Sequence, residues 1–323
     1  MLSKTDLSLL ERVRKSPILP MLADCTVDSL RQLGAQEGID FATALLYDRV
    51  CHSKRHGPFI RQLQDLASSA TPLPRLDATV VIVPGAFHEQ FPQSGADGRI
   101  VREQAARFGC RVQVIPLPNL GSLDDNARQI IDWLAGQPPT DSPILLVSLS
   151  KGGSDVKRAL EFPDAARAFA NVAVWFNLSG ILNGTPLVTW LFSGSLRSGW
   201  TRWLLRCRRC SLDVIRELDR HPGAPLDGEL QLPAHMQAIH LVGFPLRQHA
   251  TNRLARRNHR RLELYGPNDG AGILLADAAS WPGLLYPVWS ADHYLRPASF
   301  NMSCVTTALL QYAATLSAAE VPA

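Results

Sequence analysis

The chain has 323 residues, of which 46% are hydrophobic and 19% are charged, so it can bury a sizeable core. Its net charge of +4 is mild for this length and argues against a general nucleic-acid-binding protein. The first residues lack the pattern of a signal peptide, and no apolar run approaches the length of a membrane span, so we expect a cytoplasmic protein.

The six cysteines are scattered along the chain. The only close pair, Cys207 and Cys210, has no second pair to complete a zinc site. We therefore expect reduced, mostly buried thiols and no metal centre.

The amino-terminal part is expected to be helical. Apolar residues there follow helical spacing, as at Phe41, Leu45 and Leu46, and no stretch resembles a strand. A linker containing Pro72 and Pro74 follows. The sequence thus predicts a helical extension at residues 1–70, ahead of a core domain at 76–323.

From Ala78 onward, short apolar stretches alternate with helical patterns. The predicted strands lie within residues 78–85, 110–118, 142–150, 171–180, 236–244 and 283–289. Continuously apolar strands separated by helices indicate a parallel sheet that is covered on both faces. We therefore predict an α/β fold with a doubly wound, mostly parallel sheet, interrupted by a segment at about 181–233 that is rich in tryptophan and arginine.

The stretch "ILLVSLSKGGSDVKRAL" passes from the third of these strands into a helix and holds Ser148, Ser150 and Ser154. A catalytic serine needs a strained strand-turn-helix position with small residues two before and two after it. Ser150 fits, with Ser148 as the small residue before the turn, whereas Ser154 falls inside the helix. The plainer alternatives are an incidental serine or a phosphate-binding turn, and the latter lacks the glycine and lysine patterns of known phosphate loops.

This order of strands, serine turn, inserted segment and late histidine resembles the α/β-hydrolase superfamily from about Ala78 to the end of the chain. The departure is a Ser-x-Ser-x-Gly motif in place of Gly-x-Ser-x-Gly. The resemblance implies a catalytic base at His293 and an acid at Asp269, with Asp277 and Asp292 as competitors. A Pro-Asn-Asp-Gly turn would leave the Asp269 carboxylate at a loop tip.

The resemblance also implies an oxyanion hole made by the backbone amides of Lys151 and of Ala86 or Phe87, where Gly85 lets the chain turn. The segment at 181–233 would form a helical lid. Tryptophan and phenylalanine side chains of this lid could wall an apolar pocket, or could simply pack the lid onto the core: Trp190, Phe192, Trp200 and Trp203. His88 is expected to line the pocket or lie at the surface.

The run "RLARRNHRR" concentrates positive charge late in the chain, at Arg253, Arg256, Arg257, Arg260 and Arg261. Such a run is most often a solvated helix face, and its sharper interpretation is a docking patch for coenzyme A or a carrier-protein arm.

The resulting prediction is a serine hydrolase that cleaves a carboxylic ester or thioester through an acyl-enzyme, with neither metal nor organic cofactor. The alternatives are an acyltransferase or cyclase with the same residues, and a ligand-binding protein without turnover.

Overall fold

Six parallel strands form one sheet in the computed structural model, which describes residues 3–69, 75–90, 94–138, 142–193, 212–250, 253–295 and 301–319. The strands are β1 (Thr79–Val83), β2 (Arg111–Val114), β3 (Ile144–Leu149), β4 (Val172–Leu178), β5 (Gln237–Phe244) and β6 (Leu284–Trp289). Their spatial order is β2-β1-β3-β4-β5-β6, and every neighbouring pair is parallel. The predicted strands and the doubly wound sheet are confirmed.

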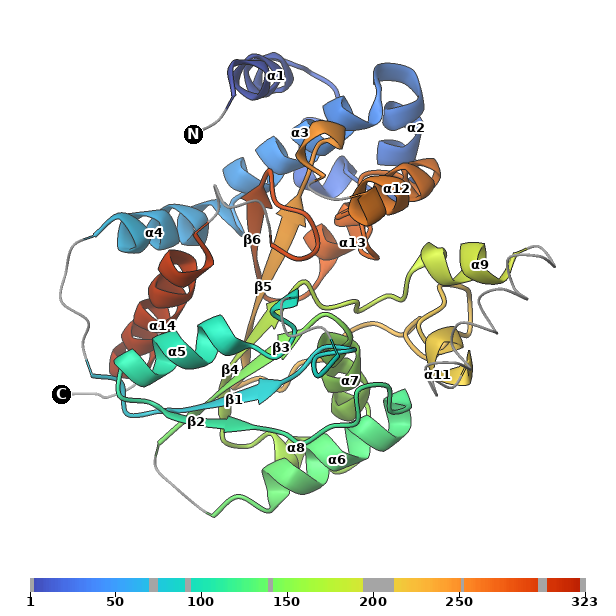
Figure 1. Cartoon of the computed structure of the whole chain (residues 1–323). Coiled ribbons are helices and arrows are strands. Elements are labelled where there is room, and N and C mark those ends of the chain that lie inside the picture. The colour runs from blue at the N-terminus through green and yellow to red at the C-terminus, as the bar shows by residue number, and fades with distance from the viewer. Residues whose placement is uncertain are drawn as a thin grey trace.

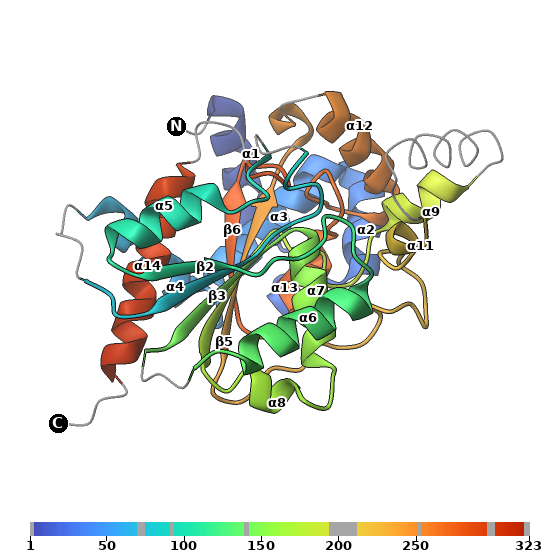
Figure 2. The same cartoon turned by 60° about the horizontal axis from the view of Figure 1, so that its bottom comes forward.

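Helices cover both faces of the sheet (Figures 1 and 2). One face carries α4 (Gly57–Ser68), α5 (Arg99–Arg107) and α14 (Met302–Ala319), and the other carries α6 (Leu123–Ala135), α7 (Lys151–Leu160) and α8 (Ala165–Ala168). Ser122 caps the start of helix α6, since its side chain accepts a hydrogen bond from the backbone amide of Asp125. None of the described helices is both long and apolar enough to cross a membrane.

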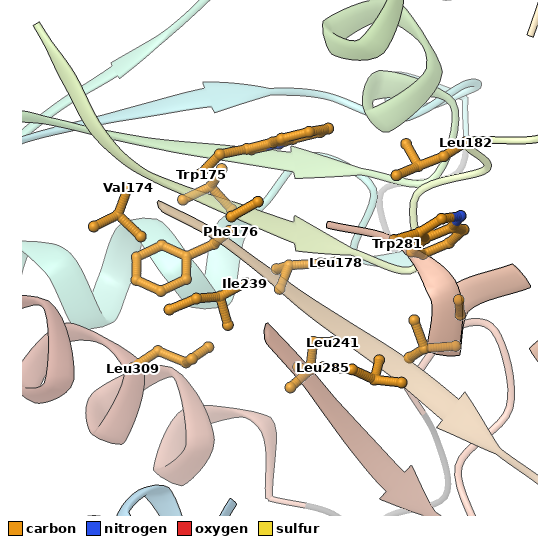
Figure 3. Packing of buried hydrophobic residues seen from close by; sticks show 14 of the residues in the cluster. Val174, Trp175, Phe176, Leu178, Leu182, Ile239, Leu241, Trp281, Leu285 and Leu309 are labelled. Atoms are coloured by element: carbon orange, nitrogen blue, oxygen red, sulfur yellow. The ribbon is translucent and has the colours of Figure 1, made fainter. Parts of the chain in front are cut away.

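Successive side chains of β4 point to opposite faces of the sheet and pack into the core on each face. Figure 3 shows Val174 and Phe176 pointing toward Leu309 of α14, whereas Trp175 lies on the opposite side of the strand. All four side chains are buried, as expected for a strand covered on both faces.

Residues 3–69 form α1 (Lys4–Arg14), the 3-10 turn η1 (Leu22–Asp24), α2 (Val27–Glu37), α3 (Ile39–His52) and α4. Leu45 and Leu46 of α3 are fully buried in the same hydrophobic cluster as the sheet. The ring of Tyr47 lies 4.7 Å, centroid to centroid, from the ring of Trp289 in β6. These helices therefore share the core of the sheet.

The remaining described elements lie between β4 and β6. They are α9 (Pro186–Phe192), α11 (Leu212–Arg216), η3 (Arg247–His249), α12 (Arg253–Leu262), η4 (Glu263–Tyr265) and α13 (Leu275–Ser280). The expected lid at about 181–233 includes α9 and α11, and its residues 194–211 lie outside the described residues.

The strand order determines where a site can form. The chain leaves β1 toward β2 on one side and then returns to β3 on the other side. Loops that follow β1 and β3 therefore diverge, and in open α/β sheets such a reversal of direction, at the carboxyl ends of the strands, is where ligands bind. Ser150 directly follows β3 at this edge.

Candidate active site

Ser150 occupies a strained turn between β3 and α7. Its backbone has φ 48° and ψ −117°, a conformation that L-residues rarely adopt. The turn is held by hydrogen bonds from the Ser150 amide to the Leu178 carbonyl (3.1 Å) and from the Gly153 amide to the Ser150 carbonyl (3.0 Å). The strained turn places the Ser150 side chain beyond the end of β3, beside His293 from a later loop.

The two glycines after Ser150 are required by close packing. A Cβ atom on Gly152 would lie 2.6 Å from the carbonyl oxygen of Val83 and 2.7 Å from that of Pro84. A Cβ atom on Gly153 would lie 2.6 Å from Cα of Gly180. Helix α7 can therefore begin directly beside β1 and the loop after β4 only because these positions lack side chains.

Three side chains from separate loops form a continuous hydrogen-bonded chain. Ser150 Oγ lies 2.9 Å from Nε2 of His293, and Nδ1 of His293 lies 2.6 Å from Oδ2 of Asp269. The His293 backbone amide also donates to the Asp269 carbonyl (2.8 Å), so the two loops are joined twice. This is the arrangement in which a histidine accepts the proton of a serine while a carboxylate fixes its tautomer.

The second oxygen of Asp269 is saturated by the backbone. Oδ1 accepts hydrogen bonds from the amides of Ala271 (3.0 Å), Gly272 (2.9 Å) and Ile273 (3.0 Å). The side chain is fully buried, so the loop that carries Asp269 points its carboxylate into the protein. The chain folds around Asp269 because its carboxylate satisfies amides that the tight turn leaves without carbonyl partners.

The other two acids considered from the sequence make different contacts. Asp277 lies on α13 and forms an ion pair with Arg220. Asp292 is buried, and its Oδ1 accepts a hydrogen bond from the backbone amide of Tyr294 (3.0 Å). Of the three acids, Asp269 is the one whose carboxylate meets His293 Nδ1.

The two buried groups shift each other's pKa in opposite directions. Burial alone would raise the pKa of Asp269, but the charge and hydrogen bond of His293 and the amides of Ala271 and Gly272 hold it below its usual value. Burial alone would lower the pKa of His293, but Asp269, with a smaller effect of Asp292, raises it above the usual value. The lowered pKa keeps Asp269 ionised at neutral pH, where its carboxylate can stabilise the protonated form of His293.

Comparison with known proteins identifies the architecture. No protein-family model and no curated protein matches the chain. A solved carboxyl esterase of metagenomic origin aligns over 79% of this chain and 80% of its own, with 22% identity and a TM-score of 0.52. The mature form of a lipase from Bacillus licheniformis aligns over 78% of this chain and 95% of its own, with 18% identity and a TM-score of 0.50. The chain has the α/β-hydrolase fold.

In an α/β-hydrolase fold the loop after the first core strand faces the serine turn, and the loop at residues 84–88 does so here. A Cβ atom on Gly85 would lie 2.9 Å from the Leu149 carbonyl oxygen and 3.4 Å from Cβ of Ser150. Glycine is thus needed at Gly85 for close approach, and it is Phe87 that has a positive φ of 58°. Ala86, Phe87 and His88 are half-buried, and Nδ1 of His88 lies 2.9 Å from the Gly85 carbonyl oxygen.

The aromatic side chains expected in the lid of this α/β-hydrolase fold are only partly described. Trp190 and Phe192 lie on α9 and are half-buried. The guanidinium of Arg261 lies 3.4 Å from the ring centroid of Trp190, and that of Arg216 lies 5.1 Å from the ring centroid of Phe192. Trp200 and Trp203 lie outside the described residues.

Sequence reasoning missed the polar contacts beneath the serine turn. The Ser148 hydroxyl is more than a small spacer, because it accepts a hydrogen bond from Nε1 of Trp175 (2.8 Å) and donates one to Oδ1 of Asn177 (3.1 Å). Nζ of Lys151 lies 2.6 Å from Oδ1 of Asp155, and both side chains are buried. Burial raises the pKa of Asp155 to about 6 despite this ion pair. The i, i+4 spacing of Lys151 and Asp155 was the available signal, but it is also typical of an exposed helix pair.

A second buried lysine was missed as well. Lys157 on α7 donates from Nζ to the carbonyl oxygens of Leu182 (2.8 Å), Leu226 (2.9 Å) and Gly228. Burial lowers the pKa of this amine. Lys157 thereby ties the beginning and the end of the inserted segment to the helix that follows Ser150.

Proposed function

We propose that the chain is a serine esterase that cleaves a carboxylic ester through an acyl-enzyme intermediate. The observation that carries the proposal is the unbroken chain of hydrogen bonds from Ser150 through His293 to Asp269. The fold adds support, because the solved structures that it resembles are described as a carboxyl esterase and a lipase.

In the proposed acylation step, Ser150 Oγ attacks the ester carbonyl carbon while His293 Nε2 takes the hydroxyl proton. Asp269 keeps the proton on Nδ1 and stabilises the imidazolium that forms. The imidazolium then protonates the leaving alcohol as the tetrahedral intermediate collapses to the acyl-enzyme. In the second half, His293 deprotonates a water molecule that attacks the acyl carbon and releases the acid and Ser150.

The negative oxygen of the tetrahedral intermediate needs donors that are already in place. We assign this role to the backbone amide of Lys151, at the first position of α7, and to that of Ala86 or Phe87. The close approach of Gly85 to the Ser150 turn supports the assignment, because it holds the two backbone segments together. One such donor typically contributes about 3 kcal/mol to transition-state stabilisation.

The geometry of Ser150, His293 and Asp269 does not distinguish between ester and thioester substrates. A thioester would use the same acyl-enzyme, and docking of coenzyme A or a carrier-protein arm at the arginines of α12 belongs to that alternative. We propose that the acyl pocket is lined by these side chains: His88, Trp190, Phe192, Trp200 and Trp203. Transfer of the acyl group to an alcohol or amine would differ only in the acceptor that reaches the acyl-enzyme.

Rapid-mixing kinetics with p-nitrophenyl esters of increasing acyl length test the proposal. We expect a burst of nitrophenol equal to the enzyme concentration whenever deacylation is the slower step, and turnover that Ser150→Ala abolishes. Ser154→Ala is the matched control, because its hydroxyl donates to the Ile181 carbonyl and not to His293. Turnover that survives in Ser150→Ala would refute the assignment, and a folded wild type without any turnover would favour a ligand-binding protein. Product analysis with and without an added alcohol separates hydrolysis from acyl transfer.

A further inference from the structure

Helix α12 presents a face made almost entirely of arginine. Its five arginines, hereafter the arginine face, follow the spacing i, i+3, i+4, i+7 and i+8 and so share one side of the helix: Arg253, Arg256, Arg257, Arg260 and Arg261. They also line a surface hollow of about 390 Å³. The opposite side of α12, with Ala255, His259 and Leu262, is buried. The helix is therefore amphipathic. Its exposed face carries only positive charge, whereas the exposed face of a surface helix usually carries charges of both signs.

No carboxylate neutralises most of this charge among the residues that the structure describes. Within the described residues, no ion pair is formed by four of the five arginines: Arg253, Arg256, Arg257 and Arg260. The carboxylate that directly follows the helix, Glu263, is engaged by Arg247 and His259. Residues 194–211, which lie outside the described part, contain five arginines and no aspartate or glutamate. Like charges three and four residues apart destabilise a helix, so a bound anion would stabilise α12.

Exposed apolar side chains stand at both ends of the arginine face. Leu254 at the start of α12 is 50% exposed, and Leu264 and Tyr265 in η4 are 79% and 38% exposed. A soluble phosphate-bearing ligand would engage the guanidinium groups alone. A phospholipid surface would engage both kinds of side chain, since anionic head groups attract arginine and the interface accepts leucine and tyrosine.

The helix also adjoins the candidate active site. Arg261 stacks on Trp190 of α9, and Nδ2 of Asn268, the residue before Asp269, donates to the His259 carbonyl (3.3 Å). Figure 2 shows α12 and α9 beside each other at the margin of the molecule. A surface that binds the arginine face would therefore come close to the loop that holds Asp269.

We propose that the arginine face docks the protein on a phospholipid bilayer that carries anionic head groups. From Arg253 to Arg261 the helix rises about 12 Å, which is long enough to contact more than one head group. Leu254, Leu264 and Tyr265 enter the interface beside them. Docking at the arginine face does not depend on catalysis at Ser150, so the two proposals can be tested separately.

Co-sedimentation with vesicles tests the proposal, using phosphatidylcholine alone and phosphatidylcholine with one third phosphatidylglycerol. The test variant is Arg253→Gln with Arg257→Gln and Arg260→Gln. The matched control replaces three exposed arginines elsewhere and so removes the same charge: Arg61→Gln with Arg107→Gln and Arg167→Gln. Wild type should bind the anionic vesicles only, with affinity falling as salt rises. The test variant should bind them about 100-fold more weakly, and the control within about threefold of wild type.

Three results would overturn the proposal. They are equal binding to both vesicle types, an equal loss in the two triple variants, and binding of free coenzyme A by a wild type that ignores anionic vesicles. The last would assign the arginine face to a soluble phosphate-bearing ligand. Ser150→Ala should bind vesicles as wild type does, so failure of the proposed esterase activity cannot be mistaken for failure of docking.

Discussion

Replacing Asp269 by asparagine should disable the enzyme through the tautomer of His293. Oδ1 of Asp269 accepts three backbone amides, so the asparagine must place its carbonyl oxygen there and its NH₂ group at the former Oδ2 position. That NH₂ group faces Nδ1 of His293, 2.6 Å away in the native structure, and turns Nδ1 into an acceptor. The proton then resides on Nε2, which can no longer accept the proton of Ser150.

A wrong tautomer of this kind costs about 10⁴-fold in kcat, which corresponds to about 5 kcal/mol of transition-state stabilisation. The assay is kcat/KM for a p-nitrophenyl ester, with circular dichroism to verify folding. Asp292→Asn is the matched control, because Asp292 is also a buried acid near His293 but accepts the Tyr294 amide. We expect it to lose less than about tenfold. If Asp269→Asn retains more than a tenth of wild-type activity, or Asp292→Asn loses more than Asp269→Asn, then Asp269 does not set the tautomer of His293.

Further predictions concern pH and packing. As a base His293 must be neutral, and its contact with Asp269 raises its pKa above the usual value for histidine, so kcat/KM should fall with falling pH through a single ionisation. Asp269→Asn should move the midpoint of this ionisation to lower pH, and an unchanged midpoint would contradict the effect of Asp269. Gly152→Ala should lower the free energy of unfolding by about 1–3 kcal/mol in urea titrations, because its Cβ would lie 2.6 Å from the Val83 carbonyl oxygen. Gly228→Ala should change it little, because the added Cβ would meet only Glu161 Oε1, at an ordinary contact distance of 3.7 Å. Lys157→Met should lower it by about 2–4 kcal/mol, since buried carbonyls lose their donor, and an unchanged urea midpoint would argue against that role.

The fold and the strained turn at Ser150 could be predicted from the sequence because both depend on local pattern. Continuous apolar runs separated by helical spacing determine a parallel sheet, and small residues around Ser150 permit its strained turn. His293 could be placed because it follows the last strand. Each of these inferences needed only the order of elements along the chain.

The order of elements does not determine which of the three candidate acids meets His293, because that depends on which loop folds inward. Asp269, Asp277 and Asp292 all lie near the expected place in the chain, and the sequence gives no sign that the Asp269 side chain is fully buried. The burial of Lys151 and Lys157 could not be predicted from the sequence either, since buried and exposed lysines of a helix occur at the same spacing. What distinguishes them is contact with Asp155 or with distant carbonyls, which only the folded chain brings together.

In the proposed mechanism, Ser150 is a nucleophile that His293 and Asp269 activate. Labelling with a fluorophosphonate, followed by mass spectrometry of the modified peptide, tests it most directly. We expect one phosphonyl group on the peptide containing Ser150, no labelling of Ser150→Ala, and full labelling of Ser154→Ala. A folded wild type that resists labelling, or a label that persists in Ser150→Ala, would contradict it.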